Sequence, residues 1–170
     1  MTSSSTGTST STSTATDQDG HDVRPLTAAG TARRVRIPSD VSLGLLLLRL
    51  VLAVVFVAHG AQKLWINGIP ATQQGFSGMG VPFPEITAIA VAVLEVAGGL
   101  LLALGLGTRI VAAILAVDMI VAMVLVHLAA GFFAAEGGYE FVLTLAVASS
   151  ALVFTGPGRF AVDALIRRGR

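Results

Sequence analysis

Three charged side chains lie inside apolar stretches of this sequence, where an ionic group is costly. Arg49 follows Ser42 by seven residues in an otherwise apolar run, and Glu95 and Asp118 each lie ten residues from the polar end of theirs. In helices that rise about 1.5 Å per residue, all three groups reach a depth of roughly 10–15 Å. We therefore expect one polar layer in which Arg49 pairs with a carboxylate. Such a layer is either a clamp that sets helix order or a proton-linked or ligand-binding centre.

A second polar group consists of His59, Lys63, His127 and Glu140, each at the end of an apolar stretch. We expect them to line a pocket in which imidazole, ammonium and carboxyl groups exchange protons with a bound ligand. The alternatives are a haem between the two histidines, a divalent metal held by them and Glu140, or plain hydrogen bonding at a membrane interface. Asp118 and His127 are nine residues apart and point in opposite directions on an ideal helix, which argues against the haem unless the helix deforms.

Four apolar stretches must position these side chains, over residues 41–63, 86–106, 108–130 and 139–155. Each is close to the ~20 residues that cross a bilayer as a helix. The sequence therefore predicts an all-α fold, an antiparallel bundle of four transmembrane helices. The short connection at 105–108 makes the second and third helices a hairpin. Pro70 predicts a short interfacial helix in the first outer loop, 64–85.

The composition agrees with a membrane protein and excludes several functions. Of the 170 residues, 54% are hydrophobic and 12% charged, against about 25% charged in an average globular chain. The net charge of +1 offers no basic face for nucleic acid. Cysteine is absent, which excludes disulfides, thiolate metal sites and iron–sulfur clusters on this chain. Any electron transfer needs a bound cofactor, a substrate or a partner.

Three segments follow from composition and charge. Residues 1–40 are rich in Ser and Thr and are predicted to be a disordered cytoplasmic tail, 41–158 form the membrane domain, and 159–170 are a basic cytoplasmic segment. Nine arginines lie on one side of the predicted bundle and Lys63 alone on the other. By the positive-inside rule, we expect a multi-pass protein of a bacterial plasma membrane with both termini in the cytoplasm.

A series of short elements stands in order along the chain: Arg49, Phe56, His59-Gly60 and Lys63-Leu64; Gly80-Val81-Pro82; Glu95, Gly98-Gly99, Gly105-Leu106 and Thr108-Arg109; Met119, Ala122, His127 and Gly131-Phe132-Phe133; residues 137–140; residues 156–159 and Asp163. Taken together, they resemble the pattern of the DoxX family of membrane proteins, from about Leu43 to the C-terminus. Asp118 is not part of that pattern.

The resemblance implies a role in membrane redox chemistry. Archaeal relatives are subunits of a thiosulfate:quinone oxidoreductase, and mycobacterial relatives resemble a scaffold joined to a superoxide dismutase and a sulfurtransferase. We therefore expect an accessory subunit or anchor of such a system rather than a complete enzyme. Its cofactor would be a quinone, bound in the pocket of His59, Lys63, His127 and Glu140. Its partners would be the lipid, a redox enzyme or a second copy of the chain. The alternatives are a small-solute or proton-coupled carrier and a ligand-free scaffold.

Overall fold

A computed structural model describes residues 39–169 of the chain, and within that range every regular element is a helix. The predicted disordered tail lies outside this range, apart from residues 39 and 40, where the first helix has already begun. The long helices are α1 (Ser39–Ala61), α3 (Pro84–Leu104), α4 (Thr108–Ala122) and α5 (Glu140–Thr155), and the short ones are α2 (Ile69–Gly78) and α6 (Val162–Arg168).

Two of the long helices continue through π-helical turns. A π turn at Gln62–Ile66 extends α1, and a π turn at Met123–His127 followed by a 3₁₀ turn at Leu128–Ala130 extends α4. With these extensions, three helices are long and apolar enough to cross a membrane, namely Val41–Ile66, Pro84–Leu104 and Thr108–Ala130. The fourth apolar helix, α5, has 16 residues and is about 24 Å long.

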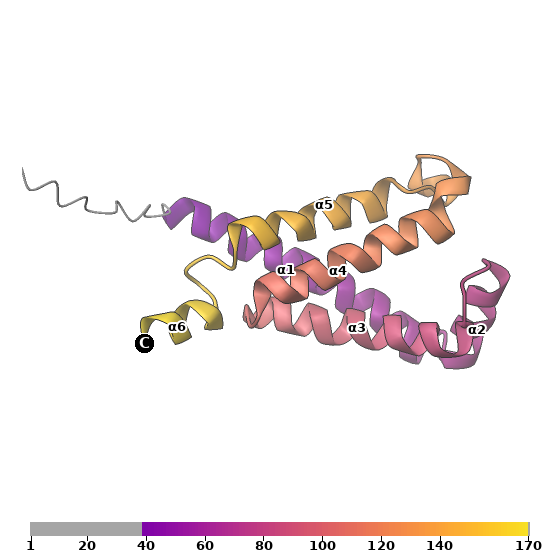
Figure 1. The fold of residues 1–170 in the computed structure, drawn as a ribbon, viewed down its shortest axis with the longest axis horizontal. Coiled ribbons are helices and arrows are strands. Elements are labelled where there is room, and N and C mark those ends of the chain that lie inside the picture. The colour runs from indigo at the N-terminus through magenta and orange to yellow at the C-terminus, as the bar shows by residue number, and fades with distance from the viewer. Residues whose placement is uncertain (1–38, 170) are drawn as a thin grey trace, which may run out of the picture. The chain divides into compact units, whose positions relative to one another are not determined.

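The long helices pack as two pairs, α1 on α3 and α4 on α5, as Figure 1 shows. The pairs are joined where the chain reverses between α3 and α4. Gly105 and Gly107 make this reversal with positive φ angles of 69° and 58°, which glycine adopts without strain. Side chains from all four long helices form the apolar core, among them Leu52, Leu102, Leu115 and Leu152.

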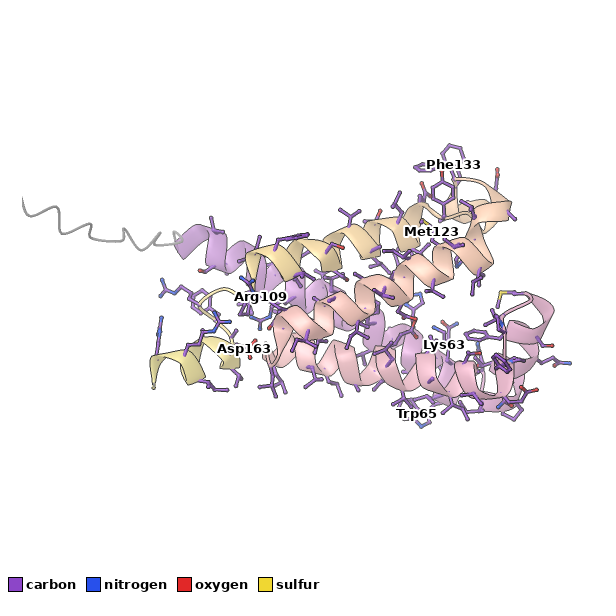
Figure 2. The ribbon with its side chains drawn as sticks, in the orientation of Figure 1. Lys63, Trp65, Arg109, Met123, Phe133 and Asp163 are labelled. Carbon is purple, nitrogen blue, oxygen red and sulfur yellow. The ribbon has the colours of Figure 1, made fainter. Side chains whose placement is uncertain are left out.

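The outward faces of the helices carry a dense apolar surface. Exposed residues include Val54, Ile110 and Val117, and Phe154 is 80% exposed. Such a surface would be costly in water, but it suits contact with lipid. Trp65 and Phe133 lie exposed at one end of the helices, on opposite sides (Figure 2). Aromatic side chains in that position are typical of a membrane interface.

The two ends of the helices differ. The end with Trp65 carries α2, whose first turn holds Pro70, so the predicted short helix is present. The same end carries the loop between α4 and α5, in which Ala134–Glu136 form a 3₁₀ turn (Figure 1). The opposite end carries the α3–α4 connection and α6. The basic C-terminal segment is therefore partly helical, which the sequence analysis did not predict.

Candidate functional site

A cavity of about 440 Å³ lies between the two helix pairs, at the end that carries α2. Most of its wall is apolar and includes three aromatic side chains, Phe56, Phe76 and Phe141. Five polar or charged side chains also reach it: His59, Lys63, Glu95, Asp118 and His127. An apolar cavity with a few convergent polar groups is the usual form of a small-molecule site.

The strongest polar contact in this cavity joins Lys63 to Glu95. The lysine Nζ lies 2.5 Å from a carboxylate oxygen of Glu95, whose side chain is only 4% exposed. Two features place Lys63 here. At Gly60, one turn earlier, a Cβ atom would lie 2.7 Å from the carbonyl oxygen of Ala92, so α1 can approach α3 closely only with glycine at this position. The Thr72 hydroxyl also donates a hydrogen bond to the Lys63 carbonyl at the π turn.

The expected pair between Arg49 and a carboxylate is wrong. Arg49 is 1% exposed and donates hydrogen bonds to four backbone carbonyls, those of Leu102, Ala103, Pro157 and Phe160. Several carbonyl oxygens can take the place of a carboxylate as partners of a guanidinium, because this group carries five N–H donors in a fixed plane. Arg49 therefore binds the end of α3 to the C-terminal segment, away from the cavity. Glu95 belongs with Lys63, which had been assigned to a separate layer.

Asp118 has no charged partner in the part of the chain that the structure describes. It lines the cavity, and its Oδ2 atom is fully buried without a hydrogen-bond partner among those residues. A buried carboxyl oxygen without a partner is rare and points to a ligand or a proton at this position. The site therefore contains one cation–carboxylate pair and one further carboxyl group.

Asp118 and His127 line the same cavity, although an ideal helix would point them in opposite directions. The π turn at Met123–His127 lies between them and turns less per residue than an α-helix, which changes the direction of His127. The structure thus contains the helix deformation that Asp118 and His127 need in order to face the same cavity.

Both histidines are held by backbone carbonyls. Nδ1 of His59 lies 2.9 Å from the oxygen of Val55, and Nδ1 of His127 lies 2.7 Å from the oxygen of Gly137. A carbonyl only accepts, so in a neutral ring Nδ1 carries the proton and Nε2 can accept one. The His59 ring also lies 5.8 Å from the ring of Phe141, between their centroids.

The prediction that Glu140 lines the pocket is wrong. Its carboxylate accepts a hydrogen bond of 2.7 Å from the backbone N–H of Ala134 and so closes the loop before α5. Within residues 39–169 no three His, Asp or Glu side chains are placed to hold a metal ion, so the alternative site of His59, His127 and Glu140 is not assembled.

The apolar lining is the part of the site that sequence reasoning missed. Phe76 comes from α2 and Phe141 from α5, and no pattern in the sequence marked either of them as functional. Phe56 appeared in the sequence analysis only as part of the family pattern. Only the folding of α2 over the cavity brings Phe76 to these residues.

A second polar cluster lies at the opposite end of the helices, around Asp163 (Figure 2). The two oxygens of this carboxylate accept hydrogen bonds from the backbone N–H groups of Gly107 and Thr108, at 2.8 and 2.9 Å. Partial burial by itself raises the pKa of Asp163, but these hydrogen bonds outweigh it and hold the pKa below its ordinary value. The cluster fastens α6 to the start of α4.

Comparison with known proteins adds a family match. The sequence model of DoxX matches residues 44–128, half of the chain. A Bacillus subtilis (strain 168) protein named "Putative oxidoreductase CatD" is 35% identical over 128 residues, which cover 75% of this chain and 90% of that protein. An uncharacterized membrane protein of Mycobacterium tuberculosis is 32% identical over 126 residues, covering 68% of this chain and 77% of its own length. No solved structure matches significantly.

Proposed function

We propose that this chain, which belongs to the DoxX family of membrane proteins, is an accessory subunit of a membrane redox system. In this role it holds a quinone-type ligand in the cavity. The observation that carries the proposal is the make-up of the cavity wall. Apolar and aromatic side chains surround it, while Lys63, Asp118 and His59 supply polar groups at separate points. A quinone has the matching form, an apolar ring with carbonyl oxygens at its edge.

The chemistry of these donors suits such a ligand. The Lys63 ammonium remains a hydrogen-bond donor while it is paired with Glu95, because it carries three N–H groups. Asp118 has a buried oxygen without a partner and can either donate or accept, depending on whether it holds a proton. A quinone, when bound, takes up two electrons and two protons. The protein groups would orient it and supply or receive the protons, as general acids and bases do.

The electrons must come from elsewhere. The chain has no cysteine and therefore no thiol or iron–sulfur centre of its own. A partner redox enzyme is the natural source, and the role of this chain is then to hold the ligand and anchor the partner. The word oxidoreductase in the name of the Bacillus subtilis relative supports a redox context.

The proposal includes a topology. α5 joins the three longer helices as a fourth crossing, and its polar ends and about 24 Å length place both ends near the headgroups. The four helices would then run antiparallel with both termini in the cytoplasm of a bacterial plasma membrane, because eight of the arginines precede α1 or follow α5 and one more lies in the first turn of α4.

The test is quinone binding to the purified full-length protein in detergent. An organic extract of protein from native membranes should contain quinone, and titration with a short-chain quinone should give a measurable Kd. Lys63→Met should weaken binding by roughly tenfold or more, since a hydrogen bond from a charged donor is worth about 1.5–3 kcal/mol. Arg109→Gln, an exposed arginine outside the cavity, serves as the control. Quinone-free protein that binds no added quinone would refute the proposal.

The unpaired Asp118 supports a second candidate, a proton-coupled carrier of small solutes. A membrane-embedded carboxyl that gains and loses a proton is a usual element of such carriers. In this reading Asp118, rather than the Lys63-paired Glu95, changes protonation during transport. Proteoliposomes with an imposed pH gradient discriminate the two candidates, because only a carrier would move protons together with solute, and Asp118→Asn would abolish the coupling.

A further inference from the structure

A second hollow lies at the opposite end of the helices, beside α6. It has a volume of about 430 Å³ and is lined by the end of α3 and the C-terminal segment, with Leu104, Phe160 and Leu165 as apolar walls. Among the residues that the structure describes, Arg159 and Arg168 are the charged groups that line it. We infer that this hollow binds the phosphate headgroup of an acidic phospholipid. The inference does not depend on the quinone proposal, because no residue of the first cavity takes part.

The hollow is a built feature rather than the chance position of a tail. Arg49, buried in the bundle, donates hydrogen bonds to the carbonyls of Pro157 and Phe160 and so fixes the backbone on both sides of Arg159. Asp163 accepts hydrogen bonds from Gly107 and Thr108 through both carboxylate oxygens, and its own backbone N–H donates to the Gly105 carbonyl. These contacts hold the start of α6 against the α3–α4 connection and the first residue of α4, next to the hollow.

The two arginines favour a phosphate. A guanidinium presents paired N–H donors that match the geometry of phosphate oxygens. The guanidinium carbon of Arg159 lies 4.9 Å from the centroid of the Phe160 ring, which restricts the direction of the side chain. Neither Asp163 nor any other carboxylate of residues 39–169 lines the hollow to oppose an anion. The carbonyl oxygens of Leu102 and Ala103, at the end of α3, accept hydrogen bonds from Arg49. They are therefore not free to repel an anion in the hollow.

The apolar part of the wall favours a lipid over a soluble anion. Leu104 lies at the end of α3, and both Leu104 and Leu100 are exposed on the surface that faces lipid. An acyl chain can lie along this surface while the headgroup occupies the hollow. Phe160, Leu165 and Ile166 are also exposed, which suits a segment that lies at the membrane surface. A soluble ligand would not explain these exposed apolar side chains. Basic pockets at the ends of transmembrane helices are known to bind acidic headgroups.

The experiment compares lipids on the delipidated full-length protein by native mass spectrometry. Phosphatidylglycerol should remain bound under conditions that strip phosphatidylcholine. The double variant Arg159→Gln/Arg168→Gln should weaken retention of phosphatidylglycerol by roughly tenfold or more. The control is Arg167→Gln, which removes one charge from α6 next to Arg168 but does not line the hollow, and which is matched to the single variant Arg168→Gln. It should retain the lipid nearly as wild type does.

Three results would overturn the inference. Equal retention of the two lipids would show that the net negative charge of the headgroup is not recognised. An equal loss in Arg167→Gln would show a diffuse basic surface instead of a site. Displacement of the lipid by millimolar inorganic phosphate would show a site for soluble anions. If the double variant does not fold, the single variants Arg168→Lys and Arg168→Gln test the inference in its place. The lysine variant should retain the lipid better, and equal retention by the two would count against the inference.

Discussion

Asp163 shows how one side chain connects segments that are more than 50 residues apart in the chain, because both of its carboxylate oxygens accept hydrogen bonds from the start of α4. Its folded pKa lies below the ordinary value. A carboxylate with a lowered pKa stabilises the fold above the unfolded pKa of about 3.9, and this contribution is lost as the pH falls through the lower folded pKa.

We predict that Asp163→Ala lowers the free energy of unfolding by about 1 kcal/mol at pH 7, the usual effect of losing a helix N-terminal acceptor. The difference from wild type should shrink as the pH falls below about 3.9. Thermal unfolding in detergent across this pH range measures it. Asp163→Asn retains one acceptor oxygen and should show a smaller loss at pH 7, which also shrinks as the wild-type carboxylate becomes protonated. A difference between Asp163→Ala and wild type that stays constant down to pH 2 would contradict the assignment.

At the scale of elements, close approach of α1 and α3 positions Lys63 beside Glu95. Gly99 lies at this crossing, and a Cβ atom there would stand 2.9 Å from the carbonyl oxygen of Ala53 and 2.8 Å from a methyl group of Val57. Gly44 lies in the same helix pair, on α1, and a Cβ atom there would meet nothing within 4 Å. The two glycines are a matched pair for testing the crossing.

We predict that Gly99→Ala destabilises the protein by about 1–3 kcal/mol, the usual cost of overpacking. Gly44→Ala should be neutral or stabilising by up to about 1 kcal/mol, because alanine has the higher helix propensity. Thermal unfolding of the two variants in the same detergent makes the comparison. If Gly99→Ala unfolds no earlier than Gly44→Ala, the helices do not cross as closely as the structure indicates.

At the scale of the whole molecule, the proposed orientation puts α2 and the α4–α5 loop outside the cell and α6 inside it. The absence of native cysteine makes single-cysteine labelling clean. An impermeant maleimide should label Gln74→Cys and Glu136→Cys in whole cells, and Gly169→Cys only after lysis. Labelling of Gly169→Cys in intact cells, or protection of either loop position, would overturn the orientation. The same result would move the basic hollow beside α6 to the outer leaflet.

The sequence by itself determined the helices and their lipid-facing character. The predicted stretch 86–106 corresponds to α3 at Pro84–Leu104, and 108–130 corresponds to the apolar helix Thr108–Ala130. Pro70 correctly marked α2, and the short connection at 105–108 marked the reversal. These features could be predicted because they depend on neighbouring residues. Helix length and apolarity, and the φ angle of a turn, are properties of a short stretch of chain.

The tertiary structure alone decided which polar groups meet. Lys63 and Glu95 are 32 residues apart, and Arg49 reaches carbonyls 53 to 111 residues away, so no local pattern encodes either contact. Counting depth along straight helices misplaced the contacts of Lys63 and of Arg49. Such counting ignores how far a long side chain reaches and how a π turn redirects it. The cavity, too, exists only where four helices and α2 converge. Partner choice inside a membrane depends on the distances between helices, which the apolar pattern does not contain.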